Sequence, residues 1–348
     1  MRAKLSSFSR DTQKTTEKNS VIRHTYRKDS VFMTKKTVAV ICAAGVGDAL
    51  IMLIASHHFQ QAGYAVTTFT HHLAGFGPWL KDFTFQRTPD IEEYAKVFAP
   101  FDLVIHQHEN SQRAKALFDL RGKGVLKKLI VFYNNYRTTK HAPLHPEFDF
   151  AFDESRSMAH NVAAATQKLL HLPAPSKEIG MTIPEGLIHR RYSRRVVIHP
   201  TSSTPKKNWW PKKFEALARK LRSRGYEPVF TVSKEERPHW LALQELGFGV
   251  PLITSLADLA KLIYESGYFI GNDSGPGHLA SYLQIPSIIL APLKQSITHW
   301  RPDWLPSKVL LPLDWIPNLK GFRLREEKWQ LFISVGRVLR TFHSLPSA

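Results

Sequence analysis

The sequence has a single cysteine and no long apolar run, and both absences narrow what the protein can be. Cys42 alone cannot form an intramolecular disulfide, which favours a reducing compartment such as the cytoplasm. The longest apolar runs, such as residues 49–55, are far too short to cross a bilayer. Residues 1–32 are polar and charged and contain no secretory apolar segment, so we expect no export.

Several binding signatures are also missing, and each absence disfavours a class of function. No Asp-x-Asp pair occurs, so the acidic clamp with which many sugar-nucleotide enzymes hold a divalent ion is lacking. Position 50 is leucine, so no Gly-x-Gly-x-x-Gly follows the first expected strand, which disfavours a dehydrogenase. There is no Gly-Lys-Ser/Thr loop and no zinc-finger, RNA-binding or basic-zipper signature. We therefore expect neither a metal nor a cofactor.

Positive charge is what the chain has in excess. The formal net charge is +19, of which residues 1–32 supply +5 and the remainder +14. A protein with this much positive charge outside its N-terminal tail is attracted to polyanions: nucleic acid, an anionic membrane surface or a phosphorylated substrate. Charge alone does not choose among these three.

The length of 348 residues suits two domains. Residues 1–32 lack periodicity and are expected to be a disordered basic tail, with Met33 as a possible true start. The alternation of apolar strands and amphipathic helices that follows predicts an α/β protein with two facing Rossmann-like domains. We place these domains at 33–185 and 186–348, because the intervening segment is rich in proline, and we expect the site in the cleft between them.

The pattern predicts individual elements as follows. Strands are expected at 38–43, 65–70, 83–87, 103–106, 129–133, 196–199, 228–232, 268–270 and 287–290. Helices are expected from Gly45–Asp48 to about 61, and at 157–170, 211–223, 235–246, 256–265 and about 325–340, with irregular structure after Pro292.

Three polar clusters follow expected strands, where anionic ligands bind in open α/β sheets. The first is Ala44-Gly-Val-Gly-Asp48. Asp48 is either the N-cap of the next helix or a carboxylate at the mouth of the cleft that takes a proton from a hydroxyl. Taken alone, the capping interpretation is favoured, because an isolated Gly-x-Gly is a weak signal.

The second cluster follows His199 and contains Thr201, Ser202, Ser203 and Lys207 before the next helix. Hydroxyls, backbone N–H groups and an ammonium at a helix entrance suit a diphosphate, although a solvated basic loop is the alternative. The neighbouring side chains are interpreted as ordinary surface charges: Lys206, Lys212 and Lys213.

The third cluster is Gly271-Asn-Asp-Ser-Gly-Pro-Gly-His278. Its glycines are expected to let the backbone approach a nucleotide diphosphate closely. Asp273 could instead be a turn or capping residue and His278 a helix histidine with satisfied hydrogen bonds. Finding glycine, acid and imidazole within eight residues favours a binding site.

The run His106-x-His108-Glu109 alternates like two metal ligands on one strand face. No third ligand group with metal spacing follows, so we interpret it as a strand leaving the core.

In their order, the clusters resemble the heptosyltransferase family, glycosyltransferase family 9, which has two facing Rossmann-like domains (GT-B). The matching residues are Gly45-Val-Gly-Asp48, Lys207-Asn-Trp-Trp-Pro-Lys-Lys-Phe214 and Asp273-Ser-Gly-Pro-Gly-His278. The resemblance spans 37 to about 340. Trp210 stands where the family usually has proline and Asn208 where it has arginine.

The resemblance implies roles for the site residues. Asp48 would be the general base of an inverting transfer, with Gly45 and Gly47 in the acceptor-side loop. Lys207 would neutralise charge on the leaving ADP. The donor would be held by Thr201, Ser202, Ser203, Lys207, Asp273, Ser274, Gly275 and His278. Glu235 or Glu236 could contact the donor ribose.

The resemblance also implies the partners. The donor would be a nucleotide sugar, ADP-heptose, and the acceptor an anionic glycolipid of the lipopolysaccharide core, reached by peripheral contact with the cytoplasmic face of the inner membrane; no nucleic acid is expected. Two alternatives stay open: a sugar-nucleotide epimerase or hydrolase, and a non-catalytic basic protein that binds anionic lipid or nucleic acid.

Overall fold

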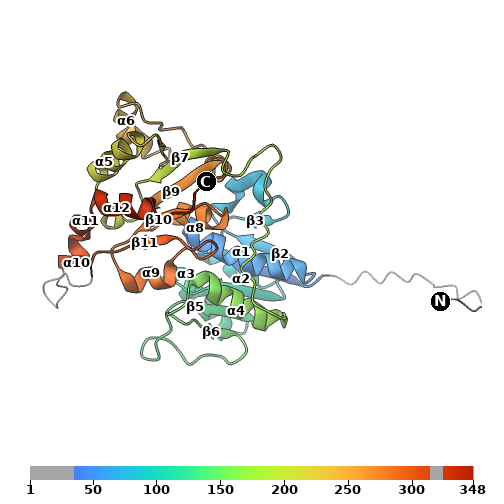
Figure 1. The fold of residues 1–348 in the computed structure, drawn as a ribbon. Helices are drawn as coiled ribbons and strands as arrows, with labels where there is room; N and C mark the ends of the chain where they lie inside the picture. The colour runs from blue at the N-terminus through green and yellow to red at the C-terminus, as the bar shows by residue number, and fades with distance from the viewer. Residues whose placement is uncertain (1–34, 314–323, 348) are drawn as a thin grey trace, which may run out of the picture. The chain divides into compact units, whose positions relative to one another are not determined.

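Two parallel β-sheets organise the computed structural model, which describes residues 35–313 and 324–347 (Figure 1). Within these ranges the strand orders are β3-β2-β1-β4-β5-β6 and β11-β10-β9-β7-β8, and every paired strand is parallel. The predicted α/β class with two Rossmann-like sheets is confirmed. The predicted tail and the possible start at Met33 lie outside the described residues.

The bounds of the elements are as follows. The strands are β1 (Thr37–Ile41), β2 (Ala65–Phe69), β3 (Thr84–Gln86), β4 (Leu103–Gln107), β5 (Leu129–Tyr133), β6 (Asp149–Ala151), β7 (Tyr192–His199), β8 (Glu227–Phe230), β9 (Ser266–Asn272), β10 (Ser287–Leu290) and β11 (Lys308–Leu310). The α-helices are α1 (Val46–Gln61), α2 (Tyr94–Phe98), α3 (Gln112–Gly122), α4 (Met158–Leu170), α5 (Pro211–Arg222), α6 (Ala242–Glu245), α7 (Leu256–Tyr264), α8 (Gly275–Tyr282), α9 (Lys294–Trp300), α10 (Leu324–Glu327), α11 (Trp329–Phe332) and α12 (Val335–Phe342). The 3₁₀ helices are η1 (Leu73–Leu80), η2 (Ile91–Glu93), η3 (Pro205–Lys207) and η4 (Arg237–Trp240).

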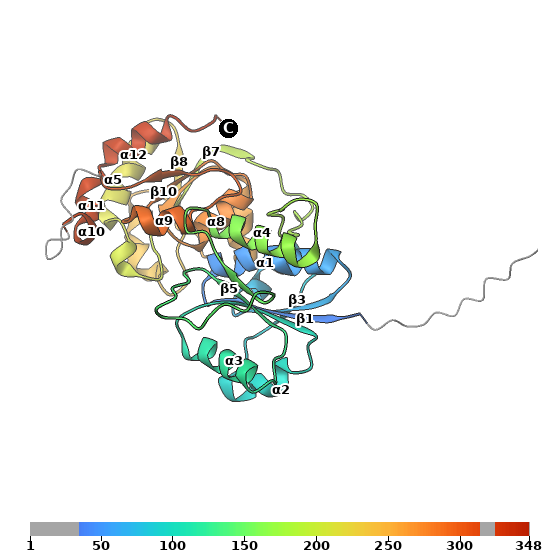
Figure 2. The same ribbon diagram turned by 90° about the horizontal axis from the view of Figure 1, so that it is seen from below.

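One apolar core is shared by both sheets. Side chains of α1, α4, α7 and α8 pack together between the sheets, while α2 and α3 cover the outer face of the first sheet and α5 and α12 that of the second (Figure 2). Helix α1 has apolar residues around most of its circumference, because the first sheet lies on one side and α8 on another. Cys42 lies in this core as a free thiol whose pKa is raised by burial.

Several elements differ from the prediction. The strands β6 and β11 and the helix α9 were not predicted; both strands have only three residues, too few for a periodicity signal. The predicted helix at 235–246 is divided into η4 and α6. The predicted C-terminal helix is divided into α10, α11 and α12, because Ser334 caps a new helix by accepting a hydrogen bond from the N–H of Arg337.

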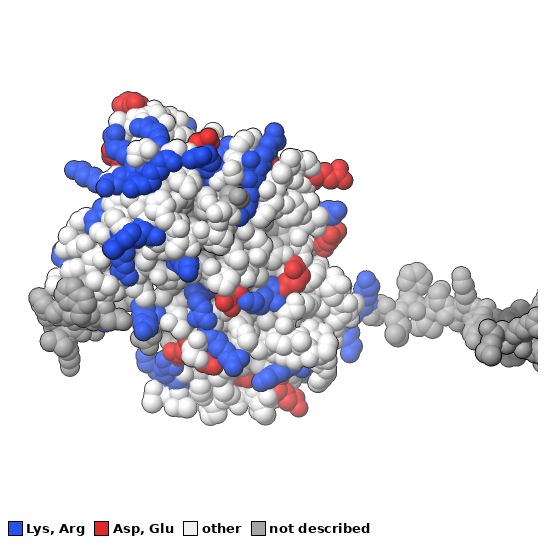
Figure 3. Space-filling view, viewed as in Figure 1, with Lys and Arg blue, Asp and Glu red and all other residues white. Residues whose placement is uncertain are grey.

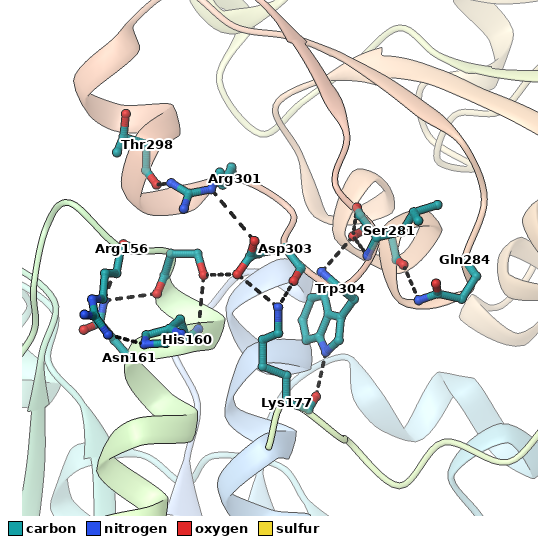
Figure 4. Close-up of polar contacts among 12 residues, drawn as sticks. Arg156, His160, Asn161, Lys177, Ser281, Gln284, Thr298, Arg301, Asp303 and Trp304 are labelled. Carbon is teal, nitrogen blue, oxygen red and sulfur yellow. Dashed lines mark hydrogen bonds and ion pairs between the residues drawn. The ribbon is translucent and has the colours of Figure 1, made fainter. Parts of the chain in front are cut away.

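Asp303 joins segments from both halves of the described chain (Figure 4). Its carboxylate accepts a hydrogen bond from the hydroxyl of Ser157, the N-cap of α4, at 2.6 Å and contacts Lys177 Nζ at 3.1 Å. The indole of Trp304 donates to the Lys177 carbonyl at 2.6 Å. The predicted boundary at 185/186 lies between α4 and β7 and stays a prediction.

In the part of the chain that the structure describes, no helix is long and apolar enough to span a membrane.

Candidate functional site

A cavity of 980 Å³ opens where the carboxyl ends of strands from both sheets face each other. Every site residue predicted from the three clusters lines it: Gly45, Gly47, Asp48, Thr201, Ser202, Ser203, Lys207, Asp273, Ser274, Gly275 and His278. Glu235 and Glu236 line it as well. The structure therefore brings together residues that are up to 233 positions apart in the sequence.

Asp48 is not a helix cap. The N-cap of α1 is Gly45, and Asp48 is the third helical residue, so the capping interpretation is wrong. A Cβ at Gly45 would lie 2.5 Å from Asp48 Oδ2, so the carboxylate folds back over this glycine. Burial raises the pKa of Asp48, whereas a hydrogen bond from Gln107 and the Lys207 charge act in the opposite direction. These contacts leave a carboxylate with raised basicity at the cavity wall.

Gln107 is a site residue that the sequence did not reveal. Its Nε2 donates to Asp48 Oδ1 at 2.9 Å, the side chain is buried, and its Oε1 has no hydrogen-bond partner among the described residues. Gln107 is the last residue of β4, which lies beside β1 in the sheet. The one signal in the sequence is that Gln107 is a polar residue at the end of an apolar strand. Only the strand order places its side chain next to Asp48.

Lys207 and Asp273 form an ion pair at the wall of the cavity. Lys207 Nζ lies 3.3 Å from Asp273 Oδ2, and the lysine side chain is 40% exposed against 9% for the aspartate. The sequence placed these residues in separate clusters on separate loops. Lys207 belongs to the loop after β7. Its contact with Asp273 places the ammonium group at the end of β9, beside the start of α8.

A buried network holds the loop after β7 in place. Asn272, at the end of β9, accepts a hydrogen bond from the Trp209 N–H at 2.9 Å and donates to the Pro200 carbonyl at 2.7 Å. The Ser202 hydroxyl is hydrogen-bonded to Asn208 Oδ1 at 2.7 Å, and Thr201 donates to Glu236 at 3.0 Å. Lys207 is thus carried by a loop anchored at several points.

Lys213 is not an ordinary surface charge, contrary to the prediction. Its ammonium donates to carbonyls at and just after the end of α11, including that of Ile333 at 3.0 Å, and burial lowers its pKa. A cation there stabilises free carbonyls at the helix C-terminus.

His278 is buried at the first turn of α8. Burial lowers the pKa of the imidazole and outweighs the Asp273 charge, which acts to raise that pKa. The ring is therefore neutral near pH 7. Its Nδ1 has no hydrogen-bond partner within the described ranges. A nitrogen of a neutral imidazole can donate or accept a hydrogen bond, depending on the tautomer.

Two glycines of the site serve helix packing. A Cβ at Gly47 would lie 2.9 Å from His278 Cδ2, and one at Gly275 would lie 3.0 Å from the Gly47 nitrogen. The N-termini of α1 and α8 touch here, so both residues must lack a side chain. From the sequence we predicted that the glycines of the third cluster let the backbone approach a ligand. The packing role of Gly275 between the two helices was not predicted.

Gly47→Ala is expected to destabilise the protein by about 1–3 kcal/mol, because the new methyl group would overlap the His278 ring. Unfolding in urea measures the change. Gly122→Ala at the end of α3 is the matched control, since no atom lies within 4 Å of its Cβ position. Equal stability of the two variants would contradict the proposed helix contact.

His106, in β4, and His108, just after it, are held by other contacts. His106 is fully buried, which lowers its pKa to about 3; His108 stacks on Tyr133 with ring centroids 4.8 Å apart; and Glu109 pairs with Arg113 at 2.9 Å. Among the described residues, no group of three His, Cys, Asp or Glu side chains is arranged to hold a metal ion.

Comparison with known proteins identifies relatives. Residues 141–292 match the family model of glycosyltransferase family 9 (heptosyltransferase). Lipopolysaccharide heptosyltransferase 3 of Escherichia coli is 33% identical over 138 residues, and the K12 protein of the same name 31% over 140 residues. These matches cover 37% and 38% of this chain and 39% of each relative, so they span about two fifths of the relatives' length.

Solved structures extend the likeness to the whole fold. E. coli ADP-heptose LPS heptosyltransferase II aligns with TM-score 0.62 at 17% identity over 88% of this chain and 98% of its own. A family 9 glycosyltransferase from Veillonella parvula aligns with TM-score 0.63 at 16% identity over 89% and 96%. E. coli heptosyltransferase WaaC with ADP-2-deoxy-2-fluoro heptose aligns with TM-score 0.58 at 15% identity over 88% and 99%. The predicted resemblance and GT-B fold are therefore confirmed: the chain is similar in sequence and in fold to the glycosyltransferase family 9 heptosyltransferases.

Proposed function

We propose that the protein is a glycosyltransferase of the heptosyltransferase type, which transfers a sugar from a nucleotide donor to a lipopolysaccharide core acceptor without a metal ion. The observation that carries this proposal is the single cavity in which Asp48 from the first half faces the Lys207–Asp273 pair from the second. A proton acceptor and a cation on opposite walls suit a displacement in which a hydroxyl attacks while a diphosphate leaves.

The donor is proposed to bind at the second sheet with ADP-heptose as the nucleotide sugar. The support is E. coli heptosyltransferase WaaC, a structural neighbour that has been solved both with ADP and with ADP-2-deoxy-2-fluoro heptose. Backbone N–H groups at the start of α8 and the ammonium of Lys207 would bind the diphosphate. The other proposed donor contacts are Thr201, Ser202, Ser203, Asp273, Ser274, Gly275 and His278, with Glu236 near the ribose.

In the proposed reaction, Asp48 takes the proton of the acceptor hydroxyl as its oxygen attacks the anomeric carbon. The bond from that carbon to the diphosphate oxygen breaks, and ADP leaves with the electron pair, so the configuration inverts. Lys207 stabilises the charge that develops on the leaving oxygen. The raised pKa of Asp48 makes its carboxylate a stronger base for this step. Gly45 and Gly47 form the loop on the acceptor side.

A donor panel and an acceptor assay test the proposal together. ADP, and not UDP, GDP or CMP, is expected to raise the melting temperature. Incubation with ADP-heptose and a heptose-deficient core glycolipid is expected to release ADP only when the acceptor is present. Donor consumption without acceptor would instead identify an epimerase or hydrolase. Absence of any nucleotide effect, combined with salt-sensitive binding to duplex DNA, would favour the non-catalytic alternative.

Gln107→Met is expected to move the acid limb of the kcat/KM profile to higher pH. The methionine has similar size but cannot donate to Asp48, and loss of that hydrogen bond raises the pKa of the carboxyl. The base must be ionised, so activity at pH 6 falls more than activity at pH 8. Gln112→Met, an exposed change at the start of α3, is the control. An unchanged profile would contradict a role for Gln107 in tuning the base.

We also propose that the protein works at the cytoplasmic face of the inner membrane, in peripheral contact with it. The support is the anionic lipid-linked acceptor that the relatives' names imply, together with the +19 charge of the chain.

A further inference from the structure

Over half of the formal net charge comes from one short part of the chain. Residues 186–226 contain twelve Lys or Arg and a single acid, Glu215, and so supply +11 of the chain's +19. Four of these cations, Lys206, Lys207, Lys212 and Lys213, lie near the cavity end of α5. The other eight form what we call the basic face: Arg190, Arg191, Arg194, Arg195, Arg219, Lys220, Arg222 and Arg224.

The fold joins two separate runs of sequence into this basic face. Arg194, in the first half of β7, donates to the carbonyls of Gly225 and Arg224 just after α5, at 2.6 and 3.3 Å. The start of β7 and the end of α5 therefore lie side by side. Lys and Arg gather over these two elements and outnumber the acids there (Figure 3).

The basic face lies away from the cavity. Strand β7 begins at Tyr192 and ends at His199, and His199 lines the cavity. Helix α5 starts near Lys207 and runs back along the sheet, so its last residues return to the edge at which β7 begins. None of the eight cations of the basic face lines the cavity, so they are not placed to contact a phosphate bound there.

Few carboxylates compensate the basic face. The one ion pair that the described residues place on it is Arg219 with Glu215, at 2.8 Å. Most of its cations are exposed, and Arg195 stacks on the Tyr192 ring with its guanidinium carbon 3.7 Å from the ring centroid. Exposed apolar groups adjoin the cations: Ile188 is 57% exposed and Tyr192 is 37% exposed.

We propose that the basic face docks the protein on an anionic phospholipid bilayer. Clustered arginine and lysine gain about 1 kcal/mol each near such a surface. Exposed isoleucine and tyrosine add the apolar contact that stable interfacial binding needs and that a nucleic-acid backbone does not offer. This docking surface would make the membrane contact of the proposed function, and in this respect the inference rests on that function.

Co-sedimentation with vesicles tests the proposal on the full chain without turnover. The protein is expected to bind phosphatidylcholine vesicles that contain phosphatidylglycerol and not to bind vesicles of pure phosphatidylcholine. High salt is expected to release the bound protein. The triple variant Arg191→Gln, Lys220→Gln, Arg224→Gln is expected to bind at least about tenfold more weakly. The matched control is Lys115→Gln, Lys123→Gln, Lys127→Gln, which removes the same charge from exposed positions around α3 and is expected to stay within about twofold of the parent.

Three results would overturn the assignment: no binding of the parent protein to anionic vesicles, equal losses in both triple variants, or tighter binding to duplex DNA that the first triple variant abolishes. The ADP-induced melting shift, measured on all three proteins, verifies that each is folded. Acceptor-dependent release of ADP, measured with a soluble core oligosaccharide, tests the proposed reaction without a membrane. Failure of docking and failure of catalysis are therefore distinguishable.

Discussion

Asp48→Asn is expected to lower kcat by about 10²–10⁴-fold while ADP still raises the melting temperature. The amide is nearly isosteric with the carboxylate but cannot accept the proton of an attacking hydroxyl. ADP binding is preserved because the proposed nucleotide contacts come from the second sheet, whereas Asp48 belongs to α1. Initial rates of acceptor-dependent ADP release, followed beside a thermal-shift titration with ADP, measure both quantities.

Asp119→Asn is the matched control for this experiment. Asp119 is an exposed carboxylate on α3, so its replacement changes the charge equally without touching the cavity. The control is expected to keep full activity. If Asp48→Asn turned over at the rate of the control, Asp48 would not be the base, even if the donor assignment stood.

Lys207→Met is expected to lower kcat by about 10²–10³-fold and to weaken ADP binding. The methionine keeps the length and apolar stem of the side chain but removes the only charge proposed to stabilise the leaving diphosphate. It also leaves the Asp273 carboxylate, 9% exposed, without its ion-pair partner, so an anionic donor meets an uncompensated negative charge. Single-turnover rates and ADP titration separate the effect on chemistry from the effect on binding.

Lys206→Met is a stringent control, because it removes the same charge one residue earlier. Among the described residues, the hydrogen bonds of Lys206 use its backbone carbonyl, which accepts from the Trp329 indole at 2.9 Å. We expect nearly unchanged kinetics. Equal losses at both positions would mean that general positive potential, rather than a placed ammonium, assists the reaction.

The predicted secondary structure was most accurate where a local signal was strong. Apolar, β-branched segments such as 129–133 and 287–290 became strands with the predicted bounds, because burial on both faces requires a continuous apolar run. Pro211 began α5 as expected. The short edge strands β6 and β11 escaped prediction, since three residues carry no distinct period.

The candidate site was predictable in part for the same reason. In parallel sheets the carboxyl ends of the strands share one edge, so polar clusters after successive strands were expected to converge, and all three line one cavity. Gln107 could not be found this way, because its partner Asp48 is 59 residues distant and the contact depends on β4 lying next to β1.

The sequence alone determined the α/β class, most strands and the residue types at the strand ends, because burial and turn chemistry are read over a few neighbouring positions. The tertiary structure decided which of those residues touch. It gave Asp48 its hydrogen bond from Gln107, paired Lys207 with Asp273, and pressed Gly47 against His278. It also merged two arginine-rich runs into one face at the edge of the sheet remote from the cavity. Such contacts depend on strand order and helix crossing, which no local pattern encodes.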